Sequence, residues 1–303
     1  MSNNNASTTA TRETSTVSKT TLVVGAVAYD PKVVTIWEGF KRWFEKHDLP
    51  FDFILYSNYE RQVEGHLAGH FHVAWNSPLA WIEADRAARA RGLHASAIAM
   101  RDTDCDLTSV VVVRAASPVH FLADLKGKIV AVGAGDSPQA TLIPLLHLAE
   151  AGLEPGRDFE VRRFDLLVGK HGDHVGGERE AARALMDGAV DAACMIDGNH
   201  LAFAREGLLP SGSTRVIATT APYDHCCFTV LEGAPAALIE RFRALLLSMS
   251  YDDAEVRPLL DLEGLKAWRP GRVEGYAQLE RAVDRFDTLG PWLASVATTP
   301  GAA

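Results

Sequence analysis

Short apolar runs alternate with segments of helical periodicity along most of this 303-residue chain. The run Leu22–Val27 suits a strand buried on both faces, and residues 31–47 place large apolar side chains near one face of a helix. The same alternation predicts further strands at 51–56, 71–75, 95–100, 109–114, 128–132, 159–164, 189–196, 214–219 and 227–231. It predicts further helices at 59–67, 78–91, 137–150, 179–187, 199–206, 236–249 and 275–287. Such an order predicts an α/β fold with parallel or mixed sheets covered by helices.

The alternation forms two blocks, and the chain returns to the first block after building the second. Neither junction, at 110–114 or at 217–222, is a Gly- or Ser-rich linker, so we expect two lobes joined by two crossing strands. A ligand would then lie in the cleft between the lobes, at strand carboxyl ends and helix amino termini. The expected organisation is a disordered tail at 1–20, a discontinuous lobe I at 21–113 plus 222–290, a lobe II at 114–221 and a flexible C-terminal tail at 291–303.

Composition excludes several classes of protein. There is no apolar stretch of about 18 residues, so we expect no membrane insertion. The net charge of −9 argues against nucleic acid as a partner, and four cysteines are too few for a disulfide scaffold. The polar segment 1–20 lacks the apolar core of an export signal, which predicts a cytoplasmic location. A periplasmic location is expected instead if the chain begins elsewhere or is exported by a non-standard route.

Several motifs occur in a familiar series. They are DLKGKIVAV at 124–132, GKH at 169–171 and ALMDGAVDAA at 184–193, preceded by YERQVE at 59–64 and WNSPLA at 75–80. The series, over roughly residues 20–290, resembles the solute-binding components of phosphate, phosphite and phosphonate ABC transporters. The resemblance implies the type II periplasmic-binding-protein fold, a small-molecule ligand and, if the chain is exported, an ABC permease as partner.

One segment departs from that family. Where the family has a Ser-Thr-Ser-Gly turn that holds the phosphonate at a helix start, this chain reads DSPQAT at 136–141. Pro138 removes an N–H donor, Gln139 and an alanine replace hydroxyl and glycine, and Asp136 adds a negative charge near the site where an anion would bind. We therefore expect a small ligand that is less anionic than a simple phosphonate.

The expected ligand contacts come from both lobes. They are aromatic side chains that would line the cleft, polar side chains near strand ends and helix starts, and two histidines at the edge of the cleft. They are Tyr29, Tyr56, Tyr59, Trp75, Asn76, Ser77, Ser137, Gln139, Thr141, His171 and His225.

A second hypothesis is a cytosolic enzyme on the same fold. The Cys-Cys-Phe stretch at 226–228 resembles a motif of the fungal-type thiamine-pyrimidine precursor synthases, which carry pyridoxal phosphate on a lysine. Those enzymes also use one of their own histidines as substrate. When this sequence is aligned with them, Asn76 stands at the position of the lysine and Ala80 at that of the histidine, and no lysine lies between Lys46 and Lys126. Since a Schiff base needs a lysine amine, we expect no cofactor of that kind, and no other cofactor.

The catalytic candidates for such an enzyme are histidine and cysteine side chains. They are His171, His225 and Cys226, with Asp173 or His174 assisting. No standard metal-ligand spacing is present, so we expect no metal, and the candidates if one is bound are His171, His174 and His225.

Overall fold

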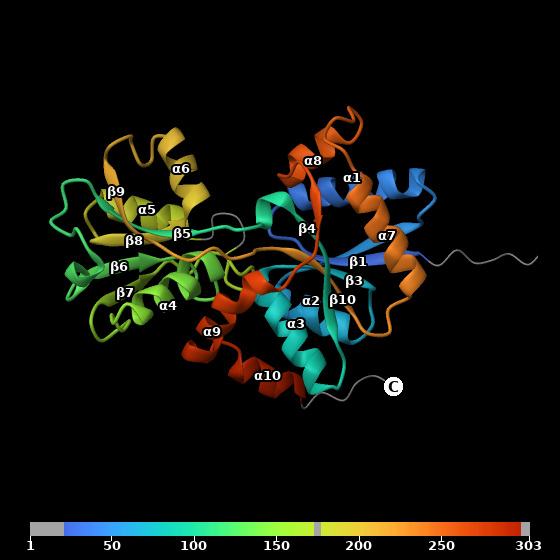
Figure 1. The fold of residues 1–303 in the computed structure, drawn as a ribbon, viewed down its shortest axis with the longest axis horizontal. Helices are drawn as coiled ribbons and strands as arrows, with labels where there is room; N and C mark the ends of the chain where they lie inside the picture. Colours follow the sequence, from blue (N-terminus) through green and yellow to red (C-terminus); the bar gives the residue numbers. More distant parts are fainter. Residues whose placement is uncertain (1–20, 173–176, 298–303) are drawn as a thin grey trace, which may run out of the picture.

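Two β-sheets, each covered by helices on both faces, form the two lobes of the molecule (Figure 1). The computed structural model describes residues 21–172 and 177–297. The lobe I sheet is mixed, with strand order β11-β4-β10-β3-β1-β2. Its strands are β1 (Leu22–Val27), β2 (Phe51–Tyr56), β3 (Val73–Asn76), β4 (Ala95–Arg101), β10 (Cys227–Leu231) and β11 (Trp268–Pro270). Strand β1 runs parallel to β2 and β3, and β10 runs antiparallel to β3 and β4.

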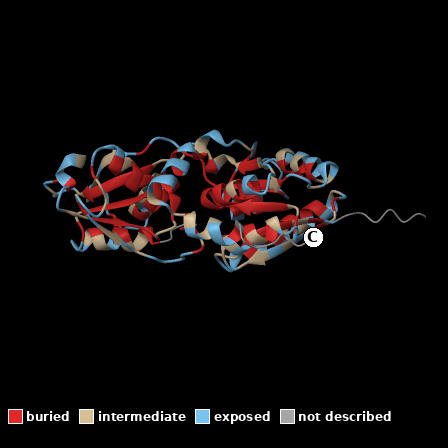
Figure 2. Ribbon diagram, turned by 90° about the horizontal axis from the view of Figure 1, so that it is seen from below, coloured by how far each residue is buried: buried red, intermediate tan, exposed pale blue. Residues whose placement is uncertain are grey.

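Large aromatic rings fill one face of the lobe I sheet, where α1 (Lys32–Lys46), α7 (Ala236–Ser248) and α8 (Arg257–Glu263) pack. The ring of Phe44 on α1 lies 4.9 Å from that of Phe51 and 5.1 Å from that of Phe242. The opposite face is covered by α2 (Tyr59–Leu67), α3 (Pro78–Ala90), α9 (Ala277–Phe286) and α10 (Gly290–Ala297). Both faces of the sheet are therefore buried (Figure 2).

The lobe II sheet has the strand order β7-β6-β8-β5-β9. Its strands are β5 (Ser109–Arg114), β6 (Ile129–Val132), β7 (Glu160–Arg163), β8 (Ala192–Ile196) and β9 (Thr214–Thr219). The valines of β5 alternate between two cores: Val111 and Val113 pack with α4 (Ile143–Glu150), whereas Val110 and Val112 pack with α5 (Glu178–Met186) and α6 (Asp197–Arg205). This alternation explains why an uninterrupted apolar run forms a strand here.

The strand β5 corrects the predicted lobe boundary. It pairs with β8 and β9 and so belongs to lobe II, whereas the sequence prediction ended lobe I at residue 113. The crossing segments are instead 102–108 and 220–226, and they pair with each other: Leu107 and Tyr223 exchange two backbone hydrogen bonds of 2.8 Å. Apolar strands at a crossing and inside a sheet look alike in sequence, because both are buried.

The C-terminal segment is a second correction. Residues 291–297 were expected to belong to a flexible tail, but they form α10, and Trp292 packs against the core cluster that contains Val27, Tyr59 and Val63. Burial of the indole offsets the ordering entropy of this short helix. The predicted tail at 1–20 lies outside the described residues, as do 298–303. No helix among the described residues is long and apolar enough to cross a membrane.

Replacing Phe242 by alanine tests the aromatic core. Phe242 is fully buried between α1, β2 and β10, so Phe242→Ala should lower the free energy of unfolding by about 3–5 kcal/mol, as other buried Phe→Ala changes do. Equilibrium urea unfolding measures the difference. Leu262→Ala, on the exposed face of α8, is the control and should stay within about 0.5 kcal/mol. Equal effects of the two changes would contradict the assigned core.

Candidate functional site

A cavity of about 190 Å³ lies between the lobes, where strand ends of both sheets face each other. We call it the interlobe cavity. Five of the residues singled out in the sequence line it: Tyr29, Trp75, Gln139, His225 and Cys226. The lining residues that the sequence did not reveal are Arg101, Thr103, Asp104, Leu107, Ile196, Gly198 and Asn199. These follow strand ends or open a helix, which is the one sequence signal that could have indicated them.

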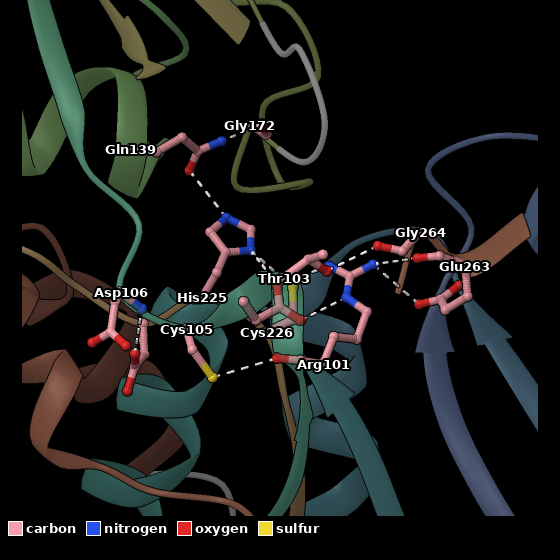
Figure 3. A network of polar contacts seen from close by, with 12 residues as sticks. Arg101, Thr103, Cys105, Asp106, Gln139, Gly172, His225, Cys226, Glu263 and Gly264 are labelled. Carbon is pink, nitrogen blue, oxygen red and sulfur yellow. Dashed lines mark hydrogen bonds and ion pairs between the residues drawn. The ribbon is translucent and has the colours of Figure 1, made fainter. Parts of the chain in front are cut away.

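The guanidinium of Arg101 is held by two carboxylates at the edge of this cavity (Figure 3). It donates to both oxygens of Asp104, at 2.6 and 2.9 Å, and to the carbonyl and carboxylate oxygens of Glu263, at 2.9 and 3.3 Å. Although burial acts to raise it, the Arg101 charge lowers the pKa of Asp104 to about 2. The Asp104 carboxylate is therefore ionised at neutral pH. Because its negative charge balances the positive charge of Arg101, this edge of the cavity has no excess of positive charge.

His225 connects the two lobes across the cavity. Its Nε2 lies 3.4 Å from Oε1 of Gln139, whose Nε2 donates to the carbonyl of Gly172 at 2.6 Å (Figure 3). The backbone of His225 is fixed by the carbonyl of Asp104 and the hydroxyl of Tyr276, each at 2.8 Å. The imidazole is thus placed by lobe I and reaches Gln139 in the helical turn that follows β6 in lobe II.

The thiol of Cys226 lies beside the same imidazole, 3.1 Å from Nδ1 of His225. The carboxylate of Asp104 also faces Nδ1, at 3.6 Å. A nucleophilic relay needs the acid on one ring nitrogen and the nucleophile on the other. Because both groups face one nitrogen here, Asp104, His225 and Cys226 do not form such a relay in this structure.

His171 forms a second polar cluster at the lobe interface. It belongs to lobe II but is buried among lobe I side chains: Nδ1 lies 2.6 Å from Oγ of Ser77, and the ring stacks on Tyr59 at 4.7 Å. Nε2 faces the carboxylates of Glu60 and Glu83, at 3.9 and 3.7 Å. Burial raises the pKa of Glu83 to about 8. Neither glutamate was anticipated, since both sit at ordinary helical positions in the sequence.

The other expected ligand contacts lie away from the interlobe cavity. Tyr56 packs on Phe71 and covers the backbone of Gly65, so its ring is part of lobe I packing. Asn76 accepts from Gln62 at 2.7 Å and donates to Thr229 at 3.0 Å. These polar groups are used to satisfy one another inside the lobe.

Three expected contacts cap or begin helices. Ser77 accepts from the backbone of Ala80 at 3.1 Å, and Ser137 accepts from Ala140 at 3.2 Å. Thr141 is buried in the π-helical turn η3 (Pro138–Leu142) that precedes α4. Together with Tyr59 and His171, these residues are absent from the cavity lining.

Two clusters of described residues bring potential metal ligands together. One contains Asp104, His225 and Cys226, and the other contains Glu60, Glu83 and His171. The candidates His171 and His225 therefore do not share a site. Asp173 and His174 lie outside the described residues. In the first cluster Arg101 already occupies both oxygens of Asp104, so a cation there would have to displace it.

The comparisons with known proteins identify the fold and the family. Solved structures with similar folds include PhnD1 from Prochlorococcus marinus (MIT 9301) in complex with methylphosphonate, at 18% identity and a TM-score of 0.66, covering 88% of this chain and 98% of that chain. XAC2383 from Xanthomonas citri bound to ATP has 17% identity and a TM-score of 0.69, with coverage of 88% and 98%. The aliphatic sulphonate binding protein SsuA from Escherichia coli has 18% identity and a TM-score of 0.55, with coverage of 89% and 88%.

These similarities confirm the two-lobed α/β periplasmic-binding-protein fold that the sequence predicted. The model of a family described as "ABC transporter, phosphonate, periplasmic substrate-binding protein" matches residues 25–276. That description gives its members a small-molecule ligand and an ABC transporter to serve, and it does not support the cytoplasmic location expected from the sequence. The chain belongs to this family of periplasmic substrate-binding proteins of phosphonate ABC transporters.

Proposed function

We propose that the chain binds a small uncharged, zwitterionic or cationic organic solute in the interlobe cavity and serves as the receptor of an ABC permease. The observation that carries this proposal is the pairing of Arg101. It is the only lysine or arginine among the described residues that line the cavity, and Asp104 and Glu263 both bind it. A dianionic ligand would have to compete with these buried carboxylates for one guanidinium.

The helix start in lobe II supports the same conclusion. Backbone N–H groups at a helix start can bind an anion only if they are free to point at it. Here the N–H groups of Ala140, Thr141 and Leu142 already donate to Ser137. Gly172 also lies directly against Ser137: a Cβ added to this glycine would stand 2.4 Å from Oγ. An anion would have to displace the loop that contains Gly172.

The cavity lining favours a small solute with an apolar part and a polar head. Tyr29, Trp75 and Leu107 offer apolar and aromatic surface, while Gln139 and His225 offer hydrogen-bonding groups. The volume is below the roughly 300–1,000 Å³ of sites for drug-sized ligands. Proteins of the same fold bind solutes as different as methylphosphonate and ATP, so the fold leaves the choice of ligand to these side chains.

A thermal-shift screen with small solutes of matched size tests the proposal. The panel contains methylphosphonate, methanesulfonate, small amino acids, neutral amides and quaternary ammonium compounds. Zwitterionic, neutral or cationic members should raise the melting temperature most, because a ligand stabilises the folded state in proportion to the logarithm of its excess over Kd. A phosphonate that gives the largest shift would overturn the proposed ligand class.

The same screen needs a pair of variants that separates cavity binding from general stabilisation. Gln139→Ala removes a lining amide and should weaken the best ligand at least tenfold. Gln278→Ala removes a similarly buried amide that donates to the carbonyl of Ala221, away from the cavity, and should leave Kd unchanged. Equal losses in the two variants would mean that the solute binds elsewhere.

Removing one of the two carboxylates on Arg101 should change the charge preference. Glu263→Gln leaves the guanidinium with one ionised partner. Methylphosphonate should then bind to this variant about 5–10-fold more tightly than to the unmodified chain, because one pairing charge typically changes the free energy of binding by about 1 kcal/mol or more. Isothermal titration measures the change. Glu240→Gln, on the exposed side of α7, is the charge-matched control. No gain in Glu263→Gln would show that Arg101 does not limit anion binding.

Glu178 should make stability depend on pH. Its Oε2 accepts from the amide of Asn199 at 2.7 Å and from the backbone of Ile196 at 3.1 Å, so it positions two lining residues. Burial raises its pKa to about 8. The folded chain therefore holds a proton that the unfolded chain, with a glutamate pKa near 4.3, releases as pH rises. This contribution to stability is complete below about pH 4 and is lost as pH rises through about 8.

Urea unfolding at several pH values should detect this dependence. Between pH 5 and 8.5, the free energy of unfolding of Glu178→Gln should fall less than that of the unmodified chain. The difference should reach up to a few kcal/mol, because one pKa unit corresponds to about 1.4 kcal/mol. Glu180→Gln, at a half-buried position of the same helix where the side chain pairs with Arg183, should keep the original slope. Identical slopes in all three chains would contradict a protonated Glu178.

A further inference from the structure

The cluster around His171 is a separate feature from the interlobe cavity. Glu60 lies in the first turn of α2, Glu83 in α3, and His171 in the lobe II loop that contacts both helices. One ligand atom from each side chain lies within 4.8 Å of the other two. None of the three residues lines the interlobe cavity. The cluster therefore needs an explanation of its own.

The polar atoms in this cluster lack partners. Nε2 of His171, Oε2 of Glu83 and Oε2 of Glu60 are buried and have no hydrogen-bond partner among the described residues. His171 and Glu83 are 1% and 2% exposed, so water does not replace the missing partners from the outside. Buried polar groups are normally bonded, because leaving them bare costs free energy. Nε2 faces Oε1 of Glu60 and Oε1 of Glu83 at 3.9 and 3.7 Å, beyond hydrogen-bond distance, so a buried imidazole and two carboxylates meet without bonding one another. This arrangement indicates a common partner.

We propose that Glu60, Glu83 and His171 bind one divalent transition-metal ion of the zinc type. One imidazole nitrogen and two carboxylate oxygens are ligands that Zn²⁺ accepts, and the two glutamates balance its charge once the metal has displaced the proton of Glu83. The imidazole disfavours Mg²⁺ and Ca²⁺, which prefer oxygen ligands. Tetrahedral zinc bonds of about 2.0–2.2 Å place two ligand atoms about 3.4 Å apart, so the separations of 3.9 and 3.7 Å between Nε2 and the glutamate oxygens would shorten by about half an ångström or less.

Ser77 supports this role of His171. Its Oγ lies 2.6 Å from Nδ1 and is fixed by its own bond to the backbone of Ala80. If Nδ1–H donates to this hydroxyl, Nε2 carries the free lone pair and points at the two carboxylates. Metal-binding histidines are usually oriented in this way by a hydrogen bond at the other nitrogen.

The metal would join the two lobes. Glu60 and Glu83 belong to lobe I and His171 to lobe II, so all three ligands are available only when the lobes meet as in this structure. Metal binding therefore favours this arrangement of the lobes. This inference goes beyond the solute-binding function and does not depend on it, because it is tested with the metal alone.

Isothermal titration of the EDTA-treated, dialysed full chain with Zn²⁺ tests the proposal. One Zn²⁺ should bind per chain, whereas Mg²⁺ should not. Glu60→Gln, at a partly exposed position that should leave the fold intact, should weaken Zn²⁺ binding at least tenfold. Glu64→Gln removes the same charge one turn further along α2, where Glu64 pairs with Arg61, and should change Kd less than threefold.

Cobalt distinguishes this site from the cluster of Asp104, His225 and Cys226. Co²⁺ bound by His171 and two glutamates should give visible d–d bands with no thiolate-to-cobalt charge-transfer band, and Cys226→Ser should leave the titration unchanged. A thiolate band, or Zn²⁺ binding that is lost in Cys226→Ser and kept in Glu60→Gln, would overturn the proposal. So would an unmodified chain that binds no Zn²⁺, because His171 would then be only an ionic contact between the lobes.

Discussion

The two crossings of the chain are hydrogen-bonded to each other, and the arrangement of the whole molecule depends on this pairing. Leu107 and Tyr223 form a two-bond bridge, and Ser109 and Thr220 continue it into lobe II. The bridge joins the end of β4 and the start of β10 to the start of β5 and the end of β9. The carboxyl ends of β1 and β3 in lobe I then face those of β6 and β8 in lobe II, which creates the interlobe cavity.

Charge balance at that junction constrains what the cavity can accept. Arg101 ends β4 and is bound by Asp104 from the first crossing and by Glu263 from the end of α8. The guanidinium is therefore a structural cation as well as a cavity residue. Histidines link the lobes on either side of it: His225 reaches Gln139, and His171 reaches Ser77 and two glutamates. The contact between the lobes thus combines these polar groups with a buried apolar cluster that Leu142 and Leu146 of lobe II share with Trp81 of α3.

Most of the fold was predictable, because burial on one or both faces leaves a periodic pattern in sequence. The strands of both sheets and the helices that cover them follow such patterns, whereas the short β11 and the helices α8 and α10 do not. The site was predictable only in part. Trp75, Gln139 and His225 could be named because Trp75 lies near the end of β3, Gln139 lies in the first turn of η3 and His225 lies just before β10. Glu60, Glu83 and Arg101 could not, because a charged residue on a helix or at a strand end is typical of solvent-exposed positions.

The sequence by itself determined the β-α order, the two-lobed fold and the loss of the hydroxyl-rich turn at 136–141, since these depend on local periodicity and on residue type at one segment. Only the tertiary structure decided that β5 belongs to lobe II, that Tyr56 packs inside lobe I and that His171 is buried among lobe I carboxylates. These outcomes depend on contacts between residues far apart in the chain, and no local pattern encodes which distant charges will share a buried site.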